Sequence, residues 1–156
     1  MAEHLATVSW ERRGEAFADN RYSRAHEWSF DGGLTVPASA SPHSVRPPMS
    51  DPHAVDPEEA FVASIASCHM LWFLFFAGKG GFVVDRYQDE AVGTMARNER
   101  GKLAMSTVVL RPAIAFSGEA PAPEALADLH HRAHEECYIA NSVKSEVVVQ
   151  GAMSLA

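Results

Sequence analysis

The segment FVASIASCHMLWFLFF, residues 61–76, constrains the fold most, because as a helix it would be apolar around its whole circumference. A helix of that kind is normally buried inside a domain, with other elements covering it on all sides. A membrane-spanning helix needs about 20 apolar residues, whereas this run is shorter and is interrupted by Ser64, Ser67 and His69. The segment is therefore predicted to be the central buried helix of a globular domain, with no membrane as partner.

The residues before this run carry the signals of a helix start. Asp56 can cap the helix, Pro57 suits the first helical position, and Glu59 follows Asp56 at the spacing of a capping box. Glu58 and Glu59 also place negative charge at the positive end of the helix dipole. The helix is predicted to begin at Pro57. For Glu59 the role is helix initiation, whereas for Glu58 a functional role stays open.

Alternating apolar residues predict β-strands on both sides of this helix. One hairpin is predicted across residues 26–36. A second hairpin, with long arms at residues 83–96 and 102–116, would turn at NERG, and a last strand is predicted at residues 145–155. The sequence thus combines strands with helices, which indicates an α+β fold.

The loop Pro37–Pro57 contains six of the nine prolines and has no periodicity. Loops of that length are usually functional or disordered. We expect this one to be a stiff rim or lid over a site on the central helix, with disorder as the alternative.

Length and composition limit the class of protein. The 156 residues, 47% of them hydrophobic, suit a single domain spanning residues 1–156. A net charge of −7 gives no basic surface for nucleic acid or anionic lipid, so neither is expected as a partner. Two cysteines do not make a disulfide scaffold, and Met1–Ser9 lacks a secretory pattern, so a cytoplasmic location is expected.

A second helix is predicted from Pro121 to Cys137. Four of its apolar residues follow helical spacing and form one stripe, with the cysteine near its centre; they are Leu126, Leu129, Ala133 and Cys137. Cys137 should therefore face the core. Because Cys68 lies in the buried central helix, the two sulfur atoms could meet.

Histidines beside this stripe raise the alternative of a metal site. His130, His134 and Cys137 lie within two turns, and Cys68 or His69 could be a fourth ligand. The spacing matches no strong zinc signature, and His130 and His134 also fit the solvent edge of an amphipathic helix. No bound metal is expected, and His69 is predicted to be a buried or interface imidazole.

Several motifs, in order, resemble the OsmC/Ohr family: YSRAHEWSFDGG, ASASP, DPEE before the apolar helix, ASCH within it, and a late CYIANSVK. The similarity runs from about residue 20 to the end. It implies an intertwined OsmC-like fold, with antiparallel sheets around a central buried helix in an obligate homodimer. It also implies reduction of organic hydroperoxides by two cysteines. Tyr138 stands where the Ohr branch usually has proline, so the chain is closer to OsmC-like members.

The resemblance assigns roles to four residues. Cys68 resembles the peroxidatic cysteine, Cys137 the resolving cysteine, Arg24 the arginine of the N-terminal hairpin, and Glu58 the glutamate that holds this arginine. Apolar burial raises the pKa of a thiol, so a cation is needed to form the thiolate; Arg24 is the first candidate and Arg46 its rival. Ten helical residues place Glu58 about 15 Å from Cys68, so it would act through Arg24 or from a second subunit.

The expected chemistry needs no bound cofactor. An external thiol, for example the dithiol dihydrolipoamide, would reset the cysteines after each turnover. An apolar wall from Phe61, Met70, Trp72 and Phe73 would favour alkyl or lipid hydroperoxides over hydrogen peroxide.

Two other classes of function stay open. A thiol hydrolase or transferase with His69 as base is disfavoured, because adjacent helical residues point about 100° apart. A small-molecule binding protein with the OsmC-like fold and no peroxidase activity is the stronger alternative, because one fold can host several functions.

Overall fold

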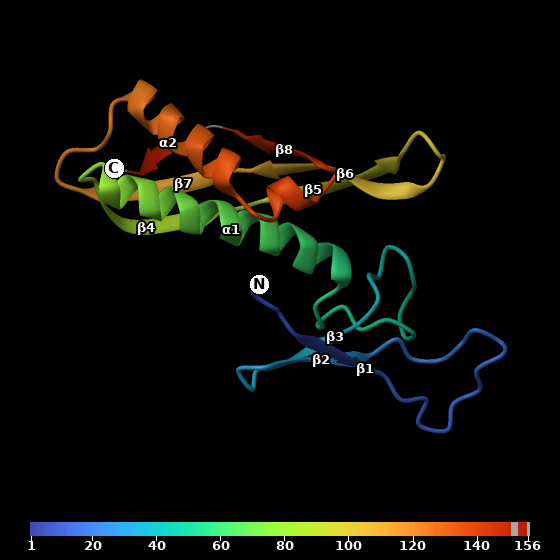
Figure 1. The fold of residues 1–156 in the computed structure, drawn as a ribbon. Coiled ribbons are helices and arrows are strands. Elements are labelled where there is room, and N and C mark those ends of the chain that lie inside the picture. The colour runs from blue at the N-terminus through green and yellow to red at the C-terminus, as the bar shows by residue number, and fades with distance from the viewer. Residues whose placement is uncertain (151–152, 156) are drawn as a thin grey trace. The chain divides into compact units, whose positions relative to one another are not determined.

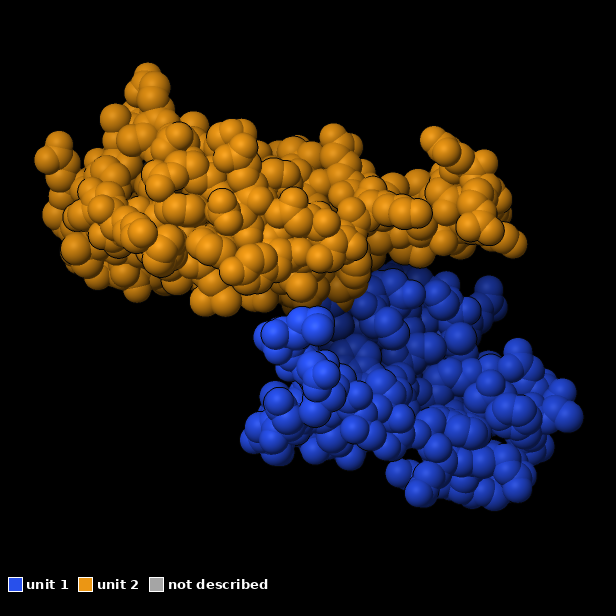
Figure 2. Space-filling view, viewed as in Figure 1, with its two compact units in different colours: residues 1–60 blue, residues 61–156 orange. Residues whose placement is uncertain are grey.

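The computed structural model describes residues 1–150 and 153–155. The chain forms two compact units, Met1–Ala60 and Phe61–Ala156 (Figure 2). The boundary between them falls within the first helix.

The first unit is built on a three-stranded antiparallel sheet, in the order β1 (Ala6–Ser9), β2 (His26–Phe30) and β3 (Thr35–Ala38). The hairpin predicted at residues 26–36 is present as β2 and β3. Gly33 has a φ of 85° in its turn, a conformation that favours glycine. Sequence reasoning missed β1, because all four of its residues are exposed and no buried alternation marks them.

The proline-rich loop after β3 is tied back to its own start. Ser39 donates its backbone N–H to the carbonyl oxygen of Val55 at 3.0 Å, and its hydroxyl oxygen accepts from the N–H of Asp51 at 2.9 Å. The N–H of Arg24 also donates to the carbonyl oxygen of Met49 at 2.7 Å. The loop is thus folded and not disordered, and its role as a lid stays a prediction.

Helix α1 (Pro57–Lys79) begins with the predicted capping box. The N–H of Glu59 donates to Asp56 Oδ1 at 2.8 Å, and the N–H of Asp56 donates to Glu59 Oε2 at 3.1 Å. By length and composition α1 could also cross a membrane, a test that the core helix of a soluble protein passes equally well.

Within the single chain, α1 is buried along one stripe only. Residues at four-residue intervals form this stripe: Ile65, His69, Phe73 and Ala77. A second stripe at the same spacing is exposed: Ala63, Ser67, Leu71 and Phe75. The cover that the sequence predicts for every face of this helix is therefore incomplete in one copy of the chain.

The described residues of the second unit form two three-stranded sheets (Figure 1). One has the order β4 (Val83–Asp89), β7 (Pro112–Ser117) and β9 (Met153–Leu155); the other has β5 (Val92–Arg97), β6 (Leu103–Leu110) and β8 (Glu146–Val149). In each sheet the first two strands are antiparallel and the third is parallel to its neighbour.

The predicted long hairpin is present, but each of its arms is two strands. β5 pairs with β6 around the turn, β4 pairs with β7, and the arms break near Asp89 and Arg111. Asp89 Oδ1 accepts a hydrogen bond from the N–H of Arg111 at 2.6 Å at this break. The last strand predicted at residues 145–155 is likewise divided into β8 and β9, and residues 151 and 152 of that prediction lie outside the described residues.

Helix α2 (Pro123–Glu136) and the short 3-10 helix η1 (Ala140–Ser142) complete the second unit. Near its start α1 packs on the β6 sheet, where Ile65 joins Val108 and Leu110 in one core cluster. Near its end α1 packs between β7 and α2, and the residues that meet there are Phe73, Ala77, Ile114, Leu126, Leu129 and Ala133. The α+β class and the inward stripe of the second helix are confirmed.

Candidate functional site

Cys68 lies midway along α1, on a flank between the buried and exposed stripes. It is half-buried and lines an apolar hollow of about 320 Å³. The other lining residues are Leu71, Trp72, Phe75 and Tyr138. A thiol in this position can contact an apolar molecule bound in the hollow.

Aromatic rings form the wall of this hollow beside Cys68, which we call the thiol pocket. The rings of Phe75 and Tyr138 each meet Trp72 edge-on, at centroid distances of 5.5 Å, and Phe76 stacks on it at 5.7 Å. Tyr138 lines the pocket and is itself 69% exposed.

The pocket differs in part from the wall predicted from the sequence. Of the four residues expected there, only Trp72 lines it; Phe73 is buried in one core cluster and Phe61 packs against the other. Leu71 and Phe75 were missed, although they follow Cys68 at the helical intervals of three and seven residues. Tyr138 comes from another part of the chain, and no local pattern links it to Cys68.

Cys137 follows the last residue of α2 and is fully buried. The pKa of its thiol is raised to about 11, chiefly by burial and also by a side-chain hydrogen bond with Cys68. The N–H of Ala140 donates to Cys137 Sγ at 3.4 Å and opposes this shift. The structure thus brings both cysteines together as free thiols.

The surroundings of the two thiols suit them to different roles. Cys137 is protonated at neutral pH and sealed from solvent, so it is a poor first nucleophile. Cys68 reaches the pocket and can meet a substrate first. The pair is suited to redox chemistry in which one sulfur reacts and the other closes a disulfide.

Arg24 lies in the first unit, where its guanidinium group is held by local contacts. It donates to the backbone carbonyl oxygen of Tyr22 and to Asn20 Oδ1, the latter at 2.6 Å, and it lies 3.7 Å from the centroid of the Tyr22 ring. It also lines an apolar hollow of about 460 Å³ within that unit, beside Trp10 and Phe17. Its action on Cys68 stays a prediction.

Glu58 and Arg46 also belong to the first unit. Glu58 lies half-buried in the first turn of α1 but, unlike Glu59, takes no part in the capping box. Arg46 is exposed, and its carbonyl oxygen accepts a hydrogen bond from the N–H of Met49 at 3.2 Å. The proposed partnership of Glu58 with Arg24, and the rivalry of Arg46, stay predictions.

Two buried histidines join α1 to α2. His69 Nε2 and His130 Nδ1 are 3.0 Å apart, and the planes of the two rings are inclined by only 4°. Burial lowers the pKa of both imidazoles to about 4, and for His69 the nearby His130 and His134 contribute, so both rings are neutral at pH 7. The predicted burial of His69 is confirmed, whereas the solvent-edge position expected for His130 is wrong, because it is 5% exposed.

This pairing bears on two of the alternatives. The imidazole of His69 is hydrogen-bonded to His130 in the core. This pairing argues against His69 as a base for Cys68. In the described part of the chain, no group of three or more His, Cys, Asp or Glu side chains is arranged to hold a metal ion.

Comparisons with known proteins agree on one family. The sequence model described as OsmC-like protein matches residues 50–151. The chain is similar to the structure of an OsmC-like protein of unknown function from Vibrio cholerae, with 52% identity, a TM-score of 0.94, and coverage of 99% of this chain and 100% of that one. A comparison with curated protein sequences gives no match.

More distant structures share the fold alone. An organic hydroperoxide resistance protein from Elizabethkingia anophelis is 18% identical, with a TM-score of 0.71 and coverage of 100% and 98% of the two chains. The organic hydroperoxide resistance protein of Bacillus subtilis is 16% identical, with a TM-score of 0.61 and coverage of 99% and 98%.

The histidine pair predicts a loss of stability in acid. The unfolded chain binds protons at imidazoles of pKa 6.5, whereas the folded pair resists protonation down to about 4. The free energy of unfolding should therefore be unaffected by this pair above about pH 6.5 and should decrease as the pH falls from 6.5 towards 4.

Urea unfolding across this pH range measures the effect. His130→Gln keeps a hydrogen-bonding partner for His69 but removes one titrating group, so its stability should depend less steeply on pH. His131→Gln, which replaces an exposed imidazole, is the control and should keep the wild-type dependence. An unchanged slope in His130→Gln would contradict the assignment.

Proposed function

Because this chain belongs to the OsmC-like protein family, we propose that it is a thiol-dependent peroxidase that reduces organic hydroperoxides to alcohols through Cys68 and Cys137. The observation that carries the proposal is the thiol pair itself, with Cys68 open to an apolar pocket and Cys137 buried beside it. The names of two structural neighbours, both organic hydroperoxide resistance proteins, support the same reaction class.

The first step is attack of the Cys68 thiolate on the terminal oxygen of the hydroperoxide. The S–O bond forms as the O–O bond breaks, so that the sulfur is oxidised to a sulfenic acid and the peroxide is reduced. The alkoxide that leaves takes up a proton and departs as the alcohol. An apolar pocket favours this step for organic substrates, because it holds the organic group and excludes water.

The second step closes a disulfide. The sulfur of Cys137 attacks the sulfenic sulfur of Cys68, the S–O bond breaks, and the hydroxyl group leaves with the Cys137 proton as water. An external dithiol then reduces the disulfide by two exchange steps and is itself oxidised to a disulfide, which restores both thiols without a bound cofactor. Dihydrolipoamide is the dithiol we propose. A reducing cytoplasm suits this cycle, and its role would be defence against oxidative stress.

Arg24 is proposed as the cation that makes Cys68 reactive, with Glu58 orienting it. Its present contacts with Tyr22 and Asn20 occupy part of the guanidinium group, which has five N–H donors in all. A guanidinium group can bind a thiolate and a carboxylate at once, which a lysine cannot do with the same geometry.

A homodimer is proposed to complete the site. The exposed stripe of α1 runs beside the thiol pocket, with Leu71 63% exposed and Phe75 47% exposed. Large apolar side chains in a row on a helix need cover, and a second copy of the chain supplies it by symmetry. The dimer would then wall the pocket around Cys68.

Exchange of each cysteine tests the mechanism. Cys68→Ser should abolish the consumption of cumene hydroperoxide with dihydrolipoamide, because among the described residues that line the pocket Cys68 supplies the sulfur atom. Cys137→Ser should give one turnover that stalls at a sulfenic acid, which dimedone labels and mass spectrometry detects. Most of the activity remaining in Cys68→Ser would refute the mechanism. No consumption by the unchanged protein would favour the binding-protein alternative.

Exchange of Arg24 tests the source of reactivity. In Arg24→Ala, alkylation of Cys68 by iodoacetamide at pH 7 should slow by about tenfold or more, with a smaller difference at alkaline pH, where the thiolate forms without help. Arg24→Lys should recover part of the rate. The matched variant Arg46→Ala should keep the wild-type profile. The opposite pattern would transfer the role to Arg46.

A charge on the exposed stripe tests the dimer. Leu71→Glu should move the protein towards monomer in sedimentation experiments at micromolar concentration, because the charge would have to be buried without a partner. Leu103→Glu changes an equally exposed leucine at the start of β6 and is the control. A monomeric wild-type chain at this concentration would contradict the dimer.

A further inference from the structure

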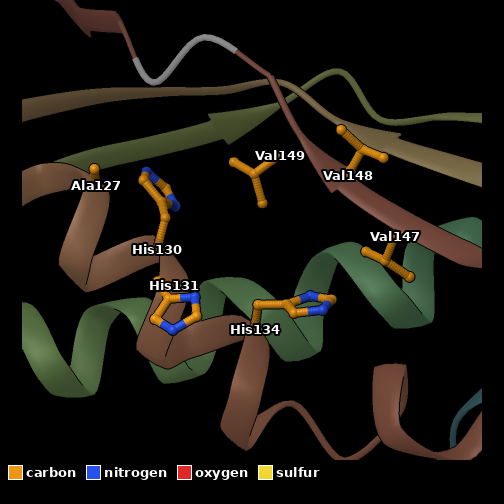
Figure 3. Close-up of a pocket in the computed structure, with 7 residues that line it drawn as sticks. All are labelled: Ala127, His130, His131, His134, Val147, Val148 and Val149. Atoms are coloured by element: carbon orange, nitrogen blue, oxygen red, sulfur yellow. The ribbon is translucent and has the colours of Figure 1, made fainter.

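A second hollow lies between α2 and β8, and it shares no lining residue with the thiol pocket. Its volume is about 450 Å³. Figure 3 shows the residues around it: Ala127, His130, His131, His134, Val147, Val148 and Val149. All of them belong to the second unit, and the mechanism above uses none of them.

The lining combines an apolar wall with a polar one. The three valines of β8 and Ala127 supply methyl groups, and the three histidines of α2 supply nitrogen atoms (Figure 3). Small-molecule sites usually have this composition, with apolar walls and a few convergent polar groups. No carboxylate is among the described lining residues, although the chain carries 20 acidic side chains.

His130 provides the strongest sign of a ligand. It is 5% exposed, and its Nε2 atom is buried with no hydrogen-bond partner in the described part of the chain. Buried polar atoms are nearly always paired, so an unpaired nitrogen on a residue that lines a hollow calls for an explanation. The Nδ1 atom of the same ring is already engaged by His69.

The pairing with His69 also permits Nε2 to act as a donor. If His69 Nε2–H donates to His130 Nδ1, the single proton of the neutral His130 ring must lie on Nε2. His131 is less available, because its Nε2 lies 3.4 Å from Glu135 Oε1. His134 is half-buried and lies one turn after His130 on the same side of α2.

We propose that this hollow binds a small organic carboxylate, whose apolar body lies against the valines of β8 and whose carboxylate accepts hydrogen bonds from His130 Nε2 and His134. An acceptor with two oxygen atoms satisfies both imidazoles at once. Because His130 Nε2 is shielded from bulk water, a carboxylate that reaches it would gain a strong, charged hydrogen bond. A metal ion fits less well, because the hollow is far larger than an ion and the described residues contain no set of three ligands.

Calorimetric titration of the full-length protein with sodium hexanoate tests the proposal, with 1-hexanol as the neutral match of equal chain length. Hexanoate should bind saturably with one molecule per chain. 1-Hexanol should bind at least tenfold more weakly, because it lacks the charged acceptor. Absence of saturable hexanoate binding, or equal affinity for both compounds, would overturn the proposal.

Two pairs of variants locate the site. Ala127→Trp fills the hollow from an exposed helical position and should abolish hexanoate binding, whereas Glu136→Trp, on an exposed position of α2 outside the lining, should preserve it. His134→Gln should weaken hexanoate binding by about tenfold, and the exposed His53→Gln should leave it unchanged.

The same variants separate this site from its rivals. Hexanoate binding that survives Ala127→Trp but is lost in Trp72→Ala would assign the ligand to the thiol pocket and refute the second site. Stoichiometric zinc binding that His134→Gln removes, without hexanoate binding, would replace the carboxylate by a metal ion.

Discussion

The buried stripe of α1 is the constraint on which the rest of the structure depends. Ile65 fixes one end of the helix on the β6 sheet, and Phe73 and Ala77 fix the other end between β7 and α2. Once this stripe faces the core, the helical repeat of 3.6 residues sets the direction in which every other side chain of α1 points. Cys68 is thereby held on the flank of the helix, and Leu71 and Phe75 are turned outward.

The contact between α1 and α2 combines two kinds of chemistry. One part holds the thiols of Cys68 and Cys137, and another holds the imidazoles of His69 and His130. In both places burial favours the neutral form, which keeps the imidazoles uncharged and the Cys137 thiol protonated. A reactive thiolate in such surroundings needs a cation from elsewhere, which is why the first unit matters to the proposed reaction.

Sequence patterns predicted the elements well where the pattern was local. The capping box at Asp56, the hairpin of β2 and β3, and the inward stripe of α2 follow from short-range spacing, and each is present. The patterns failed to predict the elements where tertiary contacts determine the structure. The exposed strand β1 has no buried alternation, and the long arms of the second hairpin break at Asp89, where a hydrogen bond from Arg111 fixes the bend.

The sequence by itself determined the family, the α+β class and the two cysteines as the residues of interest, because these depend on motif order and on helical periodicity. Only the tertiary structure decided that Tyr138 lines the thiol pocket and that His130 is buried against His69. Both outcomes depend on how α2 and the residues after it pack against α1. Helical periodicity gives the face on which a residue lies, but not the partner that this face meets, because such contacts join residues far apart in the chain.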